Sequence, residues 1–101
     1  MGILELVVFK LKDGATREQL LATVDGVNEW ASTQPGFVSR ELTYAAEEDR
    51  WIDIVRRGSL ADAESAAAAA TSSPSCAPMF GLIDEESMLF LRAESAETLA
   101  R

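Results

Sequence analysis

Apolar and β-branched side chains are concentrated in four short segments of the chain. Residues 3–12 are the densest of these, and residues 37–44 and 51–57 have the alternation and the aromatic and branched content of two further strands. Only a short acidic turn at residues 47–49 separates the last two, so they are expected to form an antiparallel hairpin. A fourth strand is predicted for residues 87–92.

Helical periodicity marks the segment between the first two strands. Residues 17–33 have one apolar face, and Thr16 followed three residues later by Gln19 predicts an N-cap with a capping box. Pro35-Gly36 ends this helix. The positions that recur at helical spacing are Leu20, Val24, Val27 and Ala31.

A second helix is expected between the third and fourth strands. It begins at Ser59, where Asp62 is placed to complete another capping box, and it contains the alanine run of residues 66–70. A short irregular or helical turn is expected over residues 76–80. Residues 93–101 have no clear apolar pattern and are expected to be a loose tail or a short helix.

The predicted order of elements is β-α-β-β-α-β. This is the ferredoxin-like α+β arrangement, in which a four-stranded antiparallel sheet has both helices on one face. The whole chain, residues 1–101, is then a single domain, which fits its length.

The strands are apolar on both sides, which is unusual for a sheet with one face in water. We expect Leu4, Leu6 and Val8 to face the helices, and this leaves Glu5 and Asp53 on the face away from them. The apolar residues of that second face are Ile3, Val7, Phe9, Trp51, Val55, Met88 and Phe90.

Such a face would be larger than the apolar patches that monomers usually expose. A second copy packed face to face would cover it and form a shared barrel, so a homodimer is predicted. The alternative is that the second face is modestly apolar and stays exposed.

Charge and composition disfavour several classes of binding partner. Seventeen acidic residues against nine basic ones give a net charge of −8, which disfavours nucleic acid and anionic membranes. No apolar run approaches the roughly 20 residues of a membrane span, and no signal peptide is recognised, so a cytoplasmic location is expected. The single cysteine, Cys76, agrees with a reducing compartment.

Four sequence stretches carry a resemblance to a known family. They are Gln-Pro-Gly-Phe at 34–37, Trp-Ile-Asp-Ile-Val at 51–55, Ser-Leu-Ala-Asp-Ala-Glu at 59–64, and Ser-Pro-Ser-Cys-Ala-Pro-Met-Phe at 73–80. With the element order, they make residues 3–92 resemble the antibiotic biosynthesis monooxygenase-like family of the dimeric α+β barrel superfamily.

This resemblance implies a homodimer with a cavity between each sheet and its helices, or at the barrel. Relatives include cofactor-independent monooxygenases that act on polycyclic aromatic substrates, and haem-degrading enzymes that use a histidine ligand. The chain has no histidine, which disfavours the haem-degrading branch. No catalytic residue of the oxygenase branch is carried over to a position in this sequence.

Asp53 and Glu5 are the candidates for a general base. A carboxylate among large apolar neighbours is partly desolvated, and this suits proton abstraction from a phenol or an enol. The alternative is that both form ion pairs across the dimer with Arg57, Arg92 or Lys10.

Four further residues are candidates for contacting a small hydrophobic or aromatic ligand. They are Trp51, Arg56, Phe9 and Phe90. Arg56 or Arg40 can hold an anionic oxygen, although strand arginines more often pair with acids such as Glu41. Trp30 and Trp51 can instead be ordinary core or interface residues.

Other chemistry has little support in the sequence. Cys76 has no histidine partner in the chain and is expected to be a spectator thiol. The acidic clusters at residues 47–49 and 84–86 lack the ligand spacing of a calcium loop and are expected to be solvated turns. No cofactor and no metal are therefore expected.

These observations favour a cofactor-independent monooxygenase that acts on a small aromatic or polyketide-like molecule. A non-catalytic small-molecule-binding or stress-related dimer would use the same cavity without a base. An isomerase or lyase, and a purely structural interaction domain, also fit this fold class.

Overall fold

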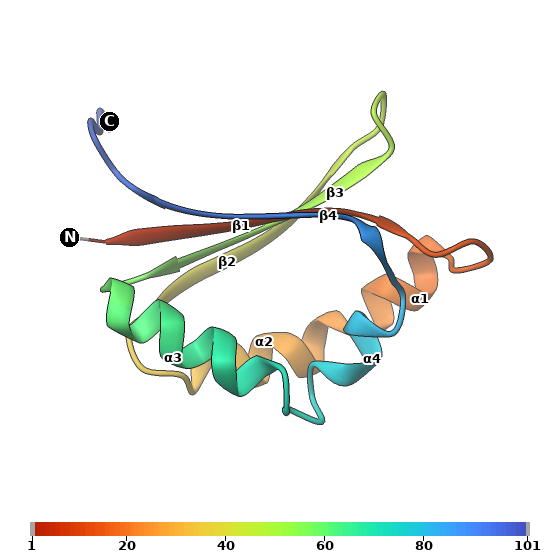
Figure 1. The fold of residues 1–101 in the computed structure, drawn as a ribbon, viewed down its shortest axis with the longest axis horizontal. Coiled ribbons are helices and arrows are strands. Elements are labelled where there is room, and N and C mark those ends of the chain that lie inside the picture. The colour runs from red at the N-terminus through yellow and green to blue at the C-terminus, as the bar shows by residue number, and fades with distance from the viewer. Residues whose placement is uncertain (1, 101) are drawn as a thin grey trace.

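The computed structural model describes residues 2–100 and contains a four-stranded antiparallel sheet with helices on one face (Figure 1). The sheet order is β2-β3-β1-β4. The elements are β1 (Ile3–Leu11), α1 (Arg17–Ala22), α2 (Val24–Ser32), β2 (Phe37–Ala45), β3 (Arg50–Arg57), α3 (Leu60–Ala70), α4 (Ala77–Phe80) and β4 (Ile83–Glu94). The ferredoxin-like α+β fold is thereby confirmed.

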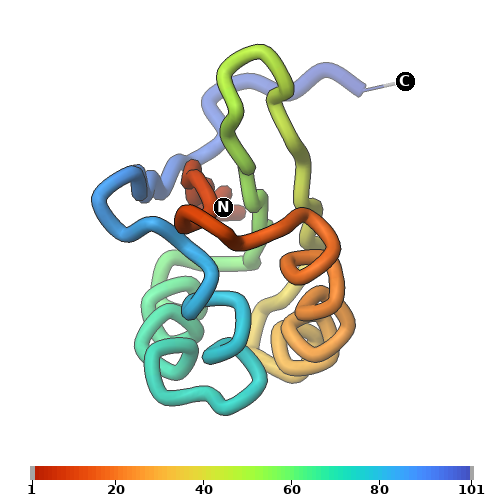
Figure 2. The backbone as a smooth tube through the Cα atoms, turned by 90° about the vertical axis from the view of Figure 1, so that its right-hand side faces the viewer, coloured from red at the N-terminus to blue at the C-terminus, as the bar shows by residue number. Residues whose placement is uncertain are grey.

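The helices form two columns beneath the sheet. Figure 2 shows α1 and α2 in one column, with α3 and α4 beside them in the other. The first helix was predicted as one segment, but Thr23 divides it, because its hydroxyl donates to the Leu20 carbonyl at 2.6 Å while the backbone turns. The predicted capping box of Thr16 and Gln19 is confirmed.

The start of α3 is tied to the loop before β2. The Ser59 hydroxyl accepts a hydrogen bond from the Asp62 amide at 3.1 Å, which confirms the predicted N-cap. Of the capping box expected with Asp62, only this half is formed. The Asp62 carboxylate lies beside Gly36, whose φ of 71° is in the left-handed region. A Cβ at Gly36 would lie 2.2 Å from Asp62 Oδ2, so only glycine fits this turn.

β4 is longer than its predicted span. It begins at Ile83, because the acidic segment expected to be a turn pairs with the end of β1, Lys10 opposite Asp84. The register shifts between Val8 and Lys10, where the Lys10 amide donates to the Ser87 hydroxyl at 2.8 Å. Residues 95–100 are neither helix nor strand, so the tail is irregular.

The face of the sheet that meets the helices is the opposite of the one predicted. Phe9 is fully buried, and Ile3, Glu5, Trp51 and Asp53 are all less than 10% exposed. The alternation was correct, but both sets of side chains are apolar enough to face a core, so the pattern could not assign the sides. The core cluster consists of Phe9, Leu20, Val27, Trp51, Met79 and Ile83.

The other face of the sheet has no helix over it (Figure 1). Strand pairing places Leu6 opposite both Ile54 and Leu91, and Leu89 and Leu91 are about half exposed. We call this surface the open face; its apolar members are Leu4, Leu6, Val8, Ile52, Ile54, Leu89 and Leu91. Within residues 2–100, no helix is long and apolar enough to cross a membrane.

Candidate functional site

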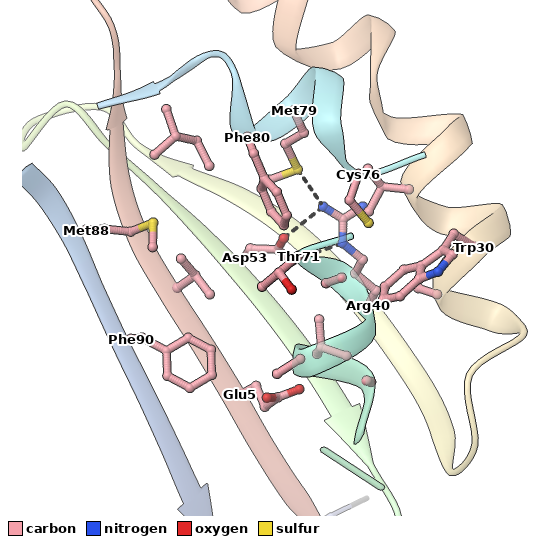
Figure 3. Close-up of a pocket in the computed structure, with 18 of the residues that line it drawn as sticks. Glu5, Trp30, Arg40, Asp53, Thr71, Cys76, Met79, Phe80, Met88 and Phe90 are labelled. Atoms are coloured by element: carbon pink, nitrogen blue, oxygen red, sulfur yellow. Dashed lines mark hydrogen bonds and ion pairs between the residues drawn. The ribbon is translucent and has the colours of Figure 1, made fainter. Parts of the chain in front are cut away.

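A cavity of about 310 Å³ lies between the sheet and the helices (Figure 3). All four strands contribute to one wall, β2 through Arg40, and α2, α3 and α4 supply the other. Its volume is at the lower end of the range of small-molecule sites, and its lining is mostly apolar, as is typical of such sites.

The alanine run of α3 keeps the cavity open. Ala66, Ala67 and Ala70 all line it, and a helix with larger side chains at these positions would fill the same space. Phe80, Met88 and Phe90 also line it and are each more than 40% exposed, so they form an apolar rim. The cavity is therefore accessible to an apolar ligand at the β4 edge.

Asp53 is held in the cavity wall by Arg40. Arg40 Nε donates to Asp53 Oδ1 at 3.0 Å and Nη2 donates to Oδ2 at 2.8 Å, which makes a bidentate pair. Arg40 Nη1 donates to the Asn28 side chain at 2.8 Å, and Nη2 also contacts the Met79 sulfur at 3.5 Å. All three guanidinium nitrogens of Arg40 are thus engaged with the protein.

Glu5 makes a second cluster, separate from the first. Arg57 Nε donates to Oε1 at 3.2 Å and Arg92 Nε donates to Oε2 at 3.1 Å. Figure 3 shows Arg40 among Trp30, Cys76 and Met79, with Glu5 away from this group. Two carboxylates meet three guanidinium groups in these clusters, so together they carry one positive charge in a chain whose net charge is −8.

The predicted ion pairs are found within one chain rather than across a dimer. Arg57 and Arg92 both pair with Glu5 as expected, whereas Asp53 pairs with Arg40. The prediction that Asp53 and Glu5 lie on the face away from the helices is wrong. Arginines from neighbouring strands neutralise both carboxylates and make their burial against the helices tolerable.

Only some of the predicted ligand contacts lie at the cavity. Phe90 is on its rim, together with the candidate bases Glu5 and Asp53 in its wall. Phe9 belongs to the core, and Arg56 points to the open face and is exposed. Trp51 lies outside the cavity, where the Arg17 guanidinium is 5.2 Å from the centre of its ring.

Two features of the site were not assigned in the sequence. Arg40 was considered a solvated arginine or a partner of Glu41, but the β2–β3 register puts Leu42 opposite Asp53, so Arg40 is its diagonal neighbour. The register of the β2–β3 hairpin would therefore have predicted this pair. The alanine run, whose small side chains leave space between helix and sheet, would have predicted the cavity.

Cys76 lines the cavity and is almost completely buried. Burial raises the pKa of its thiol, while a hydrogen bond with Ser73 and the nearby Arg40 charge oppose this effect. The thiol is therefore protonated near neutral pH and is a poor nucleophile. Among residues 2–100, no group of three or more His, Cys, Asp or Glu side chains could hold a metal ion.

Comparison with known proteins finds solved structures with the same fold. SnoaB, a cofactor-independent oxygenase from Streptomyces nogalater, superposes with a TM-score of 0.77 at 13% identity, covering 99% of this chain and 98% of that one. A proposed antibiotic biosynthesis monooxygenase from Chloroflexus aurantiacus gives a TM-score of 0.67 at 16% identity and the same coverage. A dimeric ferredoxin-like protein of unknown function from Jannaschia gives 0.71 at 10% identity, covering 94% of this chain and 100% of that one.

No protein-family model and no curated protein matches the chain. The structural neighbours therefore establish the fold: it is that of antibiotic biosynthesis monooxygenase-like proteins, as the sequence resemblance implied.

Proposed function

We propose that the protein is a cofactor-independent monooxygenase that acts on a small aromatic or polyketide-like molecule bound in this cavity. The observation that carries the proposal is an apolar cavity with buried charged groups in its wall, in a fold shared with a cofactor-independent oxygenase. An aromatic body suits the apolar lining, and the charged groups suit a reacting polar end.

In this reaction the substrate supplies the electrons. An anthrone-type methylene group loses a proton to the protein, and the resulting enolate reduces O₂. A new C–O bond forms and the O–O bond breaks, so that CH₂ and O₂ give C=O and H₂O. The protein contributes orientation, proton transfer and stabilisation of the enolate charge.

Of the two candidate bases, we propose that Asp53 takes the proton. A carboxylate has about four lone-pair positions, and Arg40 occupies two of those on Asp53, so the group retains capacity to accept a proton. Glu5 also accepts two hydrogen bonds, but from two arginines rather than one, so a proton would compete there with two cations. Arg40 fixes the Asp53 carboxylate in orientation and acts as a positioning residue.

The proposed assembly is a homodimer in which two open faces pack together. Seven apolar side chains on three strands have no helix to cover them, and the Jannaschia neighbour is described as dimeric. A cytoplasmic location is proposed because Cys76, the one cysteine, is a free buried thiol, which agrees with a reducing compartment.

The second candidate function is a non-catalytic small-molecule-binding or stress-related dimer. It is favoured by one observation, that both buried carboxylates are already engaged in ion pairs. A binding protein needs no free base, and the same pairs would then serve only to shape the cavity.

Substituting Asp53→Asn separates the two functions. For an enzyme, oxygen uptake with anthrone and phenolic substrates should fall at least tenfold while substrate affinity changes little. For a binding protein, no uptake is expected before or after the substitution, and only affinity changes. Glu64→Gln, at an exposed position on α3, is the matched control and should leave uptake unchanged.

A further inference from the structure

We propose that the ligand of the cavity carries an anionic oxygen, a carboxylate or an enolate, and that the guanidinium group of Arg57 binds this oxygen. The inference rests on the proposed function only in taking the cavity as the ligand site. It names a chemical class of ligand, an apolar ring system with an anionic group at one end.

The hydrogen bonds of Arg57 are incomplete. Its side chain is 4% exposed and lies in the cavity wall, and its Nε donates to Glu5. Its Nη1 is buried and has no hydrogen-bond partner among the described residues. A buried guanidinium N–H without an acceptor is unfavourable. Nη2 likewise makes no hydrogen bond to a described residue, so the guanidinium group has donors left for an acceptor oxygen delivered by a ligand.

Arg57 differs in this respect from the other arginine of the cavity. Arg40 has protein partners at Nε, Nη1 and Nη2, so it has little capacity left for a ligand. The two arginines lie in different clusters, which places the free donor at the Glu5 end of the cavity rather than at the Asp53 end.

The charges around Arg57 favour an anion. Arg57 and Arg92 share the single carboxylate of Glu5, so this cluster has one positive charge that no ion pair among residues 2–100 balances. Arg92 is 30% exposed and its guanidinium lies 4.9 Å from the centre of the Phe90 ring, at the rim. An anionic group therefore meets positive charge both at the rim and inside the cavity, despite the acidic chain.

The rest of the cavity demands an apolar ligand. Val27, Ala66 and Ala70 line the helix side, and Phe80 and Met88 lie at the rim. A small inorganic anion would leave this surface unfilled, whereas an aromatic carboxylate or enolate would fill it and still reach Arg57.

Naphthalene-2-carboxylate and naphthalene-2-carboxamide test the proposal, because they share an apolar body and differ in charge. Calorimetric titration of the full chain at pH 7 should show at least tenfold tighter binding of the carboxylate. Arg57→Gln should abolish this preference. Arg56→Gln, on the neighbouring residue that faces the other side of the sheet, should retain it.

Glu5→Gln gives a test of opposite sign that does not depend on the fold of the Arg57 variant. Removing the carboxylate leaves two unbalanced arginines, so the carboxylate ligand should bind several-fold tighter while the carboxamide changes little. Equal affinity of the two ligands, binding of neither, a preference that survives Arg57→Gln, or no gain in Glu5→Gln would each overturn the proposal. Oxygen uptake with neutral anthrones would still report on the oxygenase function separately.

Discussion

Asp53 on β3 and Arg40 on β2 are joined by two hydrogen bonds of 3.0 and 2.8 Å, diagonally across the β2–β3 hairpin. Both side chains are nearly enclosed, with 12% and 4% of their surface exposed. The pair connects the sheet to α2 and α4 through Asn28 and Met79, so it supports the cavity wall as well as the hairpin.

Breaking this pair should destabilise the fold. Arg40→Ala leaves Asp53 as a buried carboxylate with no cation, and the free energy of unfolding should fall by about 3–5 kcal/mol. Urea denaturation monitored by circular dichroism measures this change. Lys12→Ala, at an exposed position outside any ion pair of the described residues, should change stability by less than about 0.5 kcal/mol. Equal effects in the two variants would show that the pair is not a structural element.

The sequence predicts the fold better than the site, for a physical reason. Alternation at period two assigns residues such as Phe9 and Leu6 to opposite faces of β1, but both are apolar, so the alternation does not say which face meets the helices. The structure resolves this through packing, since Phe9 belongs to the buried core cluster together with Leu20 and Trp51. Asp53 and Glu5 were predicted to lie on the wrong face of the sheet for the same reason.

Ion pairs between residues far apart in the sequence were the second feature that the sequence could not assign. The Glu5–Arg57 and Glu5–Arg92 pairs join residues 52 and 87 positions apart, and they depend on strand order, which no local pattern encodes. The Thr16–Gln19 capping box, by contrast, lies within four residues and was predicted correctly. A hydrogen bond between residues close in sequence could thus be predicted, whereas the residues that line the cavity could be identified only from the three-dimensional structure.

The open face should be the dimer interface. Leu91→Glu places a charge on this apolar surface, on edge strand β4 opposite Leu6, and the desolvation of that charge should prevent association. Native mass spectrometry should give twice the 10.9 kDa chain mass for the wild type and a single chain mass for the variant. Leu60→Glu, at a comparably exposed position on α3, should remain dimeric. A wild-type monomer, or a dimer that survives Leu91→Glu, would contradict this interface.

The buried thiol of Cys76 should make stability fall at alkaline pH. Because burial raises its pKa in the folded state, the unfolded chain loses the proton first, above about pH 8.5. The free energy of unfolding should then decline with rising pH, by up to about 1.4 kcal/mol per pH unit, until the folded thiol also ionises. Urea denaturation from pH 7 to 10, with Cys76→Ala as the comparison, measures this contribution. An identical alkaline decline in Cys76→Ala would show that the thiol does not contribute.

Oxygen uptake with an anthrone as substrate tests most directly whether the cavity between sheet and helices is an oxygenase site. The protein without added cofactor should consume one O₂ for each anthrone, faster than the uncatalysed reaction. Ala70→Leu, which fills the cavity from α3, should reduce this rate at least tenfold, whereas Ala68→Leu, at an exposed position of the same helix, should not. Uptake at the uncatalysed rate, or uptake that is indifferent to Ala70→Leu, would contradict the account.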